Sequence, residues 1–262
     1  MKKTLKLIAL ASLVSVCGSV AAQSSVTVYG RVDLAVRHDE GYAVDPVTFA
    51  VSKAKNNGVA TGSFNALGFR GVEDLGGGLK AYFDLQHRFA ADTGVANNPF
   101  WDEISVVGLR GNWGQLQLGR QGGPYGTGPD PDAFGGDYVG GRGERKAGAD
   151  DKYNNGITYT TPDMGGFSAA IGAAERDATP TSAAGIRTPW SGYVKYAAGP
   201  LMGSLSYAHR ANGDTAWGLG ATYDFSAAKL FFAYASNNGD LAARATLDRK
   251  TMDIGGAVPM GA

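Results

Sequence analysis

Apolar and polar residues alternate along much of this chain with a period of two. In residues 25–36 the apolar positions are Val26, Val28, Val32, Leu34 and Val36. Residues 79–86 repeat the pattern, with Leu, Ala, Phe and Leu on one side and Lys, Tyr, Asp and Gln on the other. Because side chains of a β-strand point to opposite faces in turn, each segment predicts a strand with one apolar and one polar face.

The alternation predicts roughly twelve strands, joined by connections that are short and long in turn. The predicted strands are 25–36, 66–72, 79–86, 104–110, 115–119, 156–161, 167–173, 193–197, 203–209, 216–225, 229–235 and 250–258. Short connections lie at 73–78, 111–114, 162–166, 199–202 and 226–228, and longer polar ones at 38–62, 89–100, 122–155 and 175–190. Strands joined tightly at one end and loosely at the other are typical of outer-membrane barrels. No linker interrupts the series, so residues 23–262 are predicted to form one domain, with an inserted loop at about 122–148.

The first 22 residues have the features of a cleaved signal peptide. Three lysines precede an apolar run at 7–16, and small or compact residues lead up to Gln23. A lipoprotein signal is the alternative, because Cys17 follows the apolar run, but Val16 is bulkier than the small residue expected before a lipidated cysteine. The only cysteine lies inside this segment, so the exported protein is predicted to have no disulfide.

Charge and hydropathy restrict the possible partners and locations. The chain has 24 Lys and Arg against 24 Asp and Glu, and loss of the three signal lysines leaves a charge of about −3. This balance argues against a nucleic-acid partner. No later apolar stretch reaches the ~18 residues that a spanning helix needs. The exported chain is then either soluble or a closed barrel, because only helices and closed barrels satisfy every backbone group in lipid.

Aromatic residues favour the barrel over a soluble protein. Many of them lie near the ends of predicted strands, including Trp113, Tyr159, Trp190, Trp217 and Phe225. Membrane barrels place such rings in girdles at both interfaces. The alternative is a soluble exported β-sandwich that binds a ligand or another cell. An enzyme is not predicted, because the three histidines are scattered and no catalytic, zinc or phosphate-loop pattern occurs. No metal or cofactor is expected either.

Four segments resemble the trimeric general porins of Gram-negative bacteria, and they occur in the order of that family. They are SVTVYGRVD from Ser25, LGFRGVEDLGGGLKAYFDLQ from Leu67, VVGLRGNWGQLQLGRQ from Val106 and NNGITYTTPDMGGFS from Asn154. The resemblance implies an all-β fold, an antiparallel transmembrane β-barrel of the 16-stranded porin type. It also implies a homotrimer in the cell outer membrane, in contact with lipid and lipopolysaccharide. Its function would be a water-filled channel for passive diffusion of ions and small hydrophilic solutes.

The resemblance further implies a constriction with opposed charges. The loop after Gln121 occupies the place of the inward-folded third loop of the family, and AFGGD at 133–137 is similar to its tip. The matched or neighbouring candidates are Asp130, Asp132 and Asp137 on the loop, and Arg31, Arg120 and Arg142 across from it. Opposed fixed charges orient water in a narrow gap and so favour polar solutes. The alternation of side chains between the two faces of a strand (the parity of a residue) predicts three further basic residues on the lumen side, as general lining. They are Arg70, Lys80 and Arg88.

Two features depart from the family pattern. Ala66 stands where the family has an arginine just ahead of LGF, so the constriction is expected to be wider or less attractive to anions. The chain ends in AVPMGA instead of a strand with a terminal aromatic residue, with fewer strands than the family type. We therefore expect a C-terminally truncated member of the family, with a smaller genuine barrel as the alternative. If the product ends at Ala262, it is expected to assemble poorly in the membrane and to form a weak pore or none.

Overall fold

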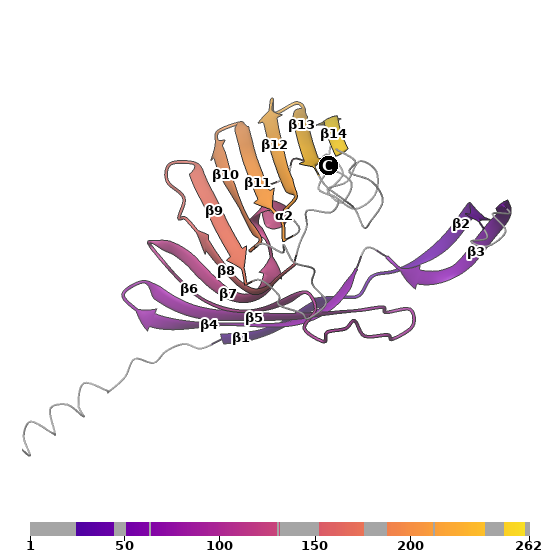
Figure 1. Cartoon of the computed structure of the whole chain (residues 1–262), viewed down its shortest axis with the longest axis horizontal. Coiled ribbons are helices and arrows are strands. Elements are labelled where there is room, and N and C mark those ends of the chain that lie inside the picture. Colours follow the sequence, from indigo (N-terminus) through magenta and orange to yellow (C-terminus); the bar gives the residue numbers. More distant parts are fainter. Residues whose placement is uncertain are drawn as a thin grey trace, which may run out of the picture.

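The structure is a computed structural model that describes residues 25–44, 51–62, 64–129, 131, 152–175, 188–211, 213–238 and 249–259. The predicted signal at 1–22 lies outside these residues and stays a prediction. Most described residues form one antiparallel sheet of twelve strands, and a second sheet has two strands. Figure 1 shows the large sheet curving from β1 round to β14, with helix α2 on its concave side and the small sheet extending away.

The large sheet follows the order of the chain, except that β2 and β3 leave it between its first two strands. Its strands are β1 (Ser25–Arg31), β4 (Asn65–Gly76), β5 (Leu79–Phe89), β6 (Ile104–Gly111), β7 (Gly114–Gly122), β8 (Lys152–Thr160), β9 (Phe167–Ala174), β10 (Trp190–Ala198), β11 (Leu201–His209), β12 (Thr215–Asp224), β13 (Lys229–Asn238) and β14 (Arg249–Ala257). Helix α2 (Pro124–Thr127) follows β7. Within the described ranges no helix is long and apolar enough to cross a membrane.

The predicted alternation is confirmed in three dimensions. Large apolar side chains of one parity are exposed on the convex face, including Val28, Val107, Ile157, Ile171, Val194, Leu205, Leu219, Leu230 and Ile254. Paired residues of antiparallel strands point to the same face, and the register keeps this series on one side from strand to strand. A sheet with an uncovered apolar outer face is the arrangement that lipid contact requires.

The connection predicted at 38–62 is wrong as a loop, and the predicted strand 25–36 is not continuous. β1 ends at Arg31, and the chain then forms the hairpin of β2 (Leu34–Val44) and β3 (Val51–Thr61). At the break, Gly62 N–H donates to the Asp33 carbonyl oxygen over 2.9 Å, and Asp33 N–H donates to the Asn65 side chain. β2 and β3 pair only with each other, and backbone pairing does not require the apolar alternation that the sequence prediction used.

Glycines within the sheet lie under aromatic rings of the neighbouring strand. A Cβ on Gly68 would lie 2.3 Å from the ring of Tyr29, and one on Gly71 would lie 2.3 Å from that of Phe83. A Cβ on Gly108 would meet the Tyr82 ring at 2.4 Å. Each ring covers backbone that glycine leaves bare, which is a known way to stabilise glycine in a sheet.

Candidate functional site

The concave face of the large sheet is the candidate functional surface. The segment around α2 identifies this face, because Tyr125 N–H donates to Ser191 Oγ over 3.1 Å and Ser204 Oγ donates to the Pro129 carbonyl oxygen over 3.3 Å. Residues that are paired across neighbouring strands point to the same face, so the register identifies the residues of each strand that share the face of Ser191 and Ser204. Residues of this parity therefore line the side on which a channel lumen would lie.

Charged side chains of the concave parity are mainly basic. Among the described strands the basic members are Arg31, Arg70, Lys80, Arg88, Arg110, Lys195 and Lys229. The acidic members are Asp74, Asp84, Asp224 and Asp253. The parity predicted for Arg70, Lys80 and Arg88 thus agrees with the register. The described wall carries an excess of positive charge.

Arg31 and Arg88 lie close together at one end of this wall. Ala66 pairs with Arg31 on one side and with Arg88 on the other. The Arg31 and Arg88 guanidinium carbons lie 4.8 and 4.7 Å from the centre of the same ring, that of Phe64. The alanine that replaces a family arginine is therefore flanked by two arginines whose positions are fixed by cation–π contact.

Carboxylates compensate part of this charge. Asp33 Oδ2 lies 2.5 Å from Arg31, and Glu103 lies between two cations, with Oε2 2.8 Å from Arg88 Nε and Oε1 2.5 Å from Lys152 Nζ. The Glu103 side chain is 15% exposed. Sequence reasoning missed Glu103, Lys152 and Phe64, because all three lie where a strand begins or in a connection, outside the alternating segments.

Arg120 is held differently from Arg31 and Arg88. It pairs with Ser105 and has the parity of the exposed Leu118, beside an irregularity in register between Gly119 and Gln121. Its Nε donates to the Asp102 carbonyl oxygen over 2.7 Å, and its other described partner is the Asn154 side chain. The structure does not bring Arg120 together with Arg31, and its role in a constriction stays a prediction.

The connection between β5 and β6 is fixed to the same end of the wall by Asp102. Its carboxylate accepts the Arg88 backbone N–H over 2.8 Å and Asn97 Nδ2–H over 2.9 Å. Burial alone would raise the pKa of the Asp102 carboxyl, but these hydrogen bonds and the attraction of the His87 ring outweigh it and hold the pKa below its ordinary value. The His87 ring also stacks on Phe100, with centroids 4.1 Å apart.

The remaining lining residues form a connected row deeper along the wall. Arg70 pairs with Asp84, and its guanidinium carbon lies 5.1 Å from the centre of the Tyr29 ring. The Tyr29 hydroxyl donates to Asp84. Lys80 pairs with Arg110. By contrast, Asp130, Asp132, Asp137 and Arg142 lie outside the described residues, so the predicted opposition of charges stays a prediction.

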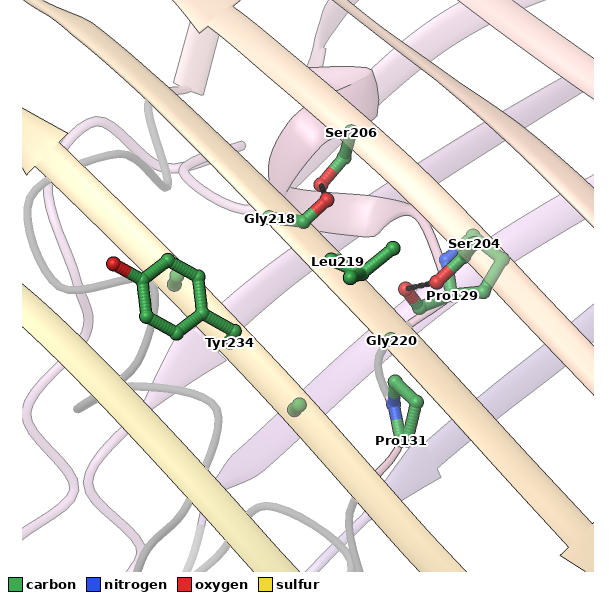
Figure 2. Close-up of a pocket in the computed structure, with 10 residues that line it drawn as sticks. Pro129, Pro131, Ser204, Ser206, Gly218, Leu219, Gly220 and Tyr234 are labelled. Atoms are coloured by element: carbon green, nitrogen blue, oxygen red, sulfur yellow. Dashed lines mark hydrogen bonds between the residues drawn. The ribbon is translucent and has the colours of Figure 1, made fainter.

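The described part of the segment after β7 packs on the concave face over a track of small residues. Helix α2 begins at Pro124 after the N-cap residue Gly123, and proline suits the first helical position. The Tyr125 side chain is fully buried. Figure 2 shows Pro129 beside Ser204 and Pro131 beside Gly220. A Cβ on Gly220 would lie 2.3 Å from Pro131 Cδ, and one on Gly172 would lie 2.9 Å from Pro124 Cδ. Small residues on β9–β13 thus leave room for this segment inside the curve of the sheet.

A curved sheet with an apolar convex face, a charged concave face and a segment packed inside it matches one known family. The profile of the Gram-negative porins matches residues 9–262. The chain belongs to the Gram-negative porin family. The match confirms the resemblance seen in the sequence, and the curved sheet agrees with the predicted fold class.

Individual relatives agree with this assignment. Outer membrane porin protein 32 of Delftia acidovorans is 38% identical over 250 residues, which cover 88% of this porin and 68% of the relative. An outer membrane porin of Bordetella pertussis is 33% identical, with 90% and 69% covered. Among solved structures, the anion-selective porin from Comamonas acidovorans aligns with a TM-score of 0.73 at 33% identity, covering 91% of this chain and 75% of the other. This porin is accordingly an outer-membrane channel protein and not an enzyme.

Proposed function

We propose that this porin passes ions and small hydrophilic solutes by passive diffusion with a preference for anions. The observation that carries the proposal is the excess of Arg and Lys over Asp and Glu on the concave face of the described strands. Fixed charge along a pore concentrates mobile ions of the opposite sign and lowers their barrier to entry. The solved structure at 33% identity is described as an anion-selective porin, which supports the same preference.

The proposal includes the assembly and export of the chain. We propose a homotrimer, with residues 1–22 removed on export and the loop at about 122–148 folded into the lumen. The packing of the described residues 122–129 and 131 on the concave face supports that position for the loop. Heat-modifiable trimers that contain this chain in outer-membrane fractions, with a mature N-terminus at Gln23, are the expected result, and they would refute the expectation of poor assembly for a product that ends at Ala262.

Reversal potentials test the selectivity directly. The chain, purified from outer membranes and reconstituted in planar bilayers across a KCl gradient, should give conductance steps and a reversal potential of the sign for Cl⁻. The preference should weaken between 0.1 and 1 M salt, because the screening length falls from about 10 to about 3 Å. Absence of conductance, or a reversal potential of the sign for K⁺, would contradict the proposal.

A further inference from the structure

Glu103 lies on the channel wall, although the alternation of apolar and polar residues along the strands does not identify it as a lining residue. It lies just before β6 and bridges Arg88 and Lys152 with its two carboxylate oxygens, at 2.8 and 2.5 Å. Arg88 has the concave parity and shares the Phe64 ring with Arg31. The carboxylate therefore lies on the same side as the group of cations at this end of the wall.

The burial of Glu103 makes its charge effective. Its side chain is 15% exposed, while those of Arg88 and Lys152 are 37% and 33% exposed. A carboxylate with little solvent around it is less screened than one in open water, and its field acts mainly on the two cations that it contacts. A passing anion consequently meets Arg88 with part of its charge already compensated.

The other described cations at this end differ in their compensation. Arg31 has Asp33 as its carboxylate partner, whereas the described partners of Arg120 are the neutral oxygens of Asp102 and Asn154. Among the described residues at this end, Glu103 is the one carboxylate that contacts cations from two strands of the large sheet, Arg88 of β5 and Lys152 of β8. Of these two cations, Arg88 has the concave parity, whereas Lys152 at the start of β8 has the opposite parity to Tyr153, whose hydroxyl donates to Ser191 on the concave face. A change at Glu103 therefore alters the effective charge of one lining residue, Arg88, and of a second cation beside it.

We propose that Glu103 is a specificity-determining residue of the channel, which limits anion preference because its negative charge offsets part of the positive charge of Arg88 and Lys152. This inference rests on the proposed function, since it concerns the selectivity of the same wall. It also explains how a wall with excess positive charge can keep Arg88 and Lys152 in fixed positions.

The test is the change in the anion-to-cation permeability ratio on Glu103→Gln in planar bilayers at 0.1 M KCl. The variant should raise the ratio by about twofold or more, because loss of one negative charge leaves the positive charge of Arg88 and Lys152 without its carboxylate partner. Glu73→Gln is the matched control, since Glu73 has the convex parity and lies near the opposite end of the strands. It should leave the ratio at the wild-type value.

A double-variant cycle distinguishes neutralisation from a general charge effect. Arg88→Gln alone should change the ratio only slightly, whereas the same substitution in the Glu103→Gln background should lower it strongly. Glu103→Asp keeps the charge but shortens the side chain, so it should give an intermediate ratio, and it serves if Glu103→Gln fails to fold. Additive effects, or a Glu103→Gln ratio equal to wild type, would overturn the inference. The expected changes are measured relative to the wild-type ratio and do not depend on which ion the wild type prefers. A failure of this inference can therefore be distinguished from a failure of the proposed function.

Discussion

At the scale of single residues, glycine decides how closely the segment after β7 approaches the wall. Gly220 has concave parity, and a Cβ there would lie 2.3 Å from Pro131 Cδ. Gly203 lies on the neighbouring strand with convex parity, and the nearest atom to its Cβ would be 4.0 Å away. Substitutions at these two glycines therefore differ in whether they disturb the packed segment.

Gly220→Val should displace the segment at Pro131 and destabilise the porin by about 1–3 kcal/mol, the usual cost of overpacking. Thermal unfolding in detergent measures the destabilisation, and single-channel conductance reports the displaced segment. Gly203→Ala is the control, with both quantities expected near wild type. Equal effects of the two substitutions would show that the contact with Pro131 does not hold the segment.

At the scale of elements, the connection between β5 and β6 is held by a carboxylate rather than by an apolar core. Asp102 receives hydrogen bonds from Arg88 and Asn97, and its side chain is 13% exposed. Because the pKa of Asp102 is lower in the folded porin, folding favours the charged carboxylate. Its stabilising contribution is fully present above the ordinary aspartate pKa of about 3.9 and is lost as pH falls through the folded-state pKa.

Asp102→Asn should destabilise the porin by about 1–2 kcal/mol at neutral pH, because the charge-assisted hydrogen bonds become neutral ones. The difference in thermal midpoint between wild type and variant should shrink as pH falls below about 4, because Asp102 becomes protonated first in the unfolded chain and then, at its lowered pKa, in the folded porin. Unfolding curves at pH 7, 5 and 3 measure this. A difference that is the same at all three pH values would contradict the role given to the carboxylate.

At the scale of the whole molecule, the two faces of the sheet determine where the chain can reside. Ile157 is 48% exposed on the convex face, whereas Thr160 on the same strand has the concave parity. A charge on the lipid face costs about 2–4 kcal/mol near the bilayer midplane, while lumen substitutions mainly change selectivity. The same new lysine should therefore have opposite consequences at these positions.

Ile157→Lys should reduce the amount of folded, heat-modifiable protein in outer membranes, and Thr160→Lys should leave it close to wild type. Fractionation followed by electrophoresis with and without heating measures both. Thr160→Lys should in addition increase the anion preference, because it adds positive charge to the concave face. Equal losses of folded protein in both variants would contradict the assignment of the faces.

The sequence by itself determined the strands and the side to which each residue points. The period of two gives the face of each residue in the regular parts of the strands, so the parity of Arg70, Lys80 and Arg88 was predictable without the structure. The family was predictable as well, because its strand and turn segments occur here in order. The hairpin β2–β3 was not, since backbone hydrogen bonds hold it without an apolar alternation.

Only the tertiary structure decided which charged residues meet. Glu103, Arg88 and Lys152 are far apart in sequence and come together because β5, β6, β7 and β8 pair in register. Likewise, Arg120 on β7 is separated from Arg31 on β1 by the strands β4, β5 and β6 and by the opposite parity, although both are arginines near strand ends. Parity is a local property of one strand, whereas an ion pair depends on the distance between side chains of several strands, and this distance is set by their pairing.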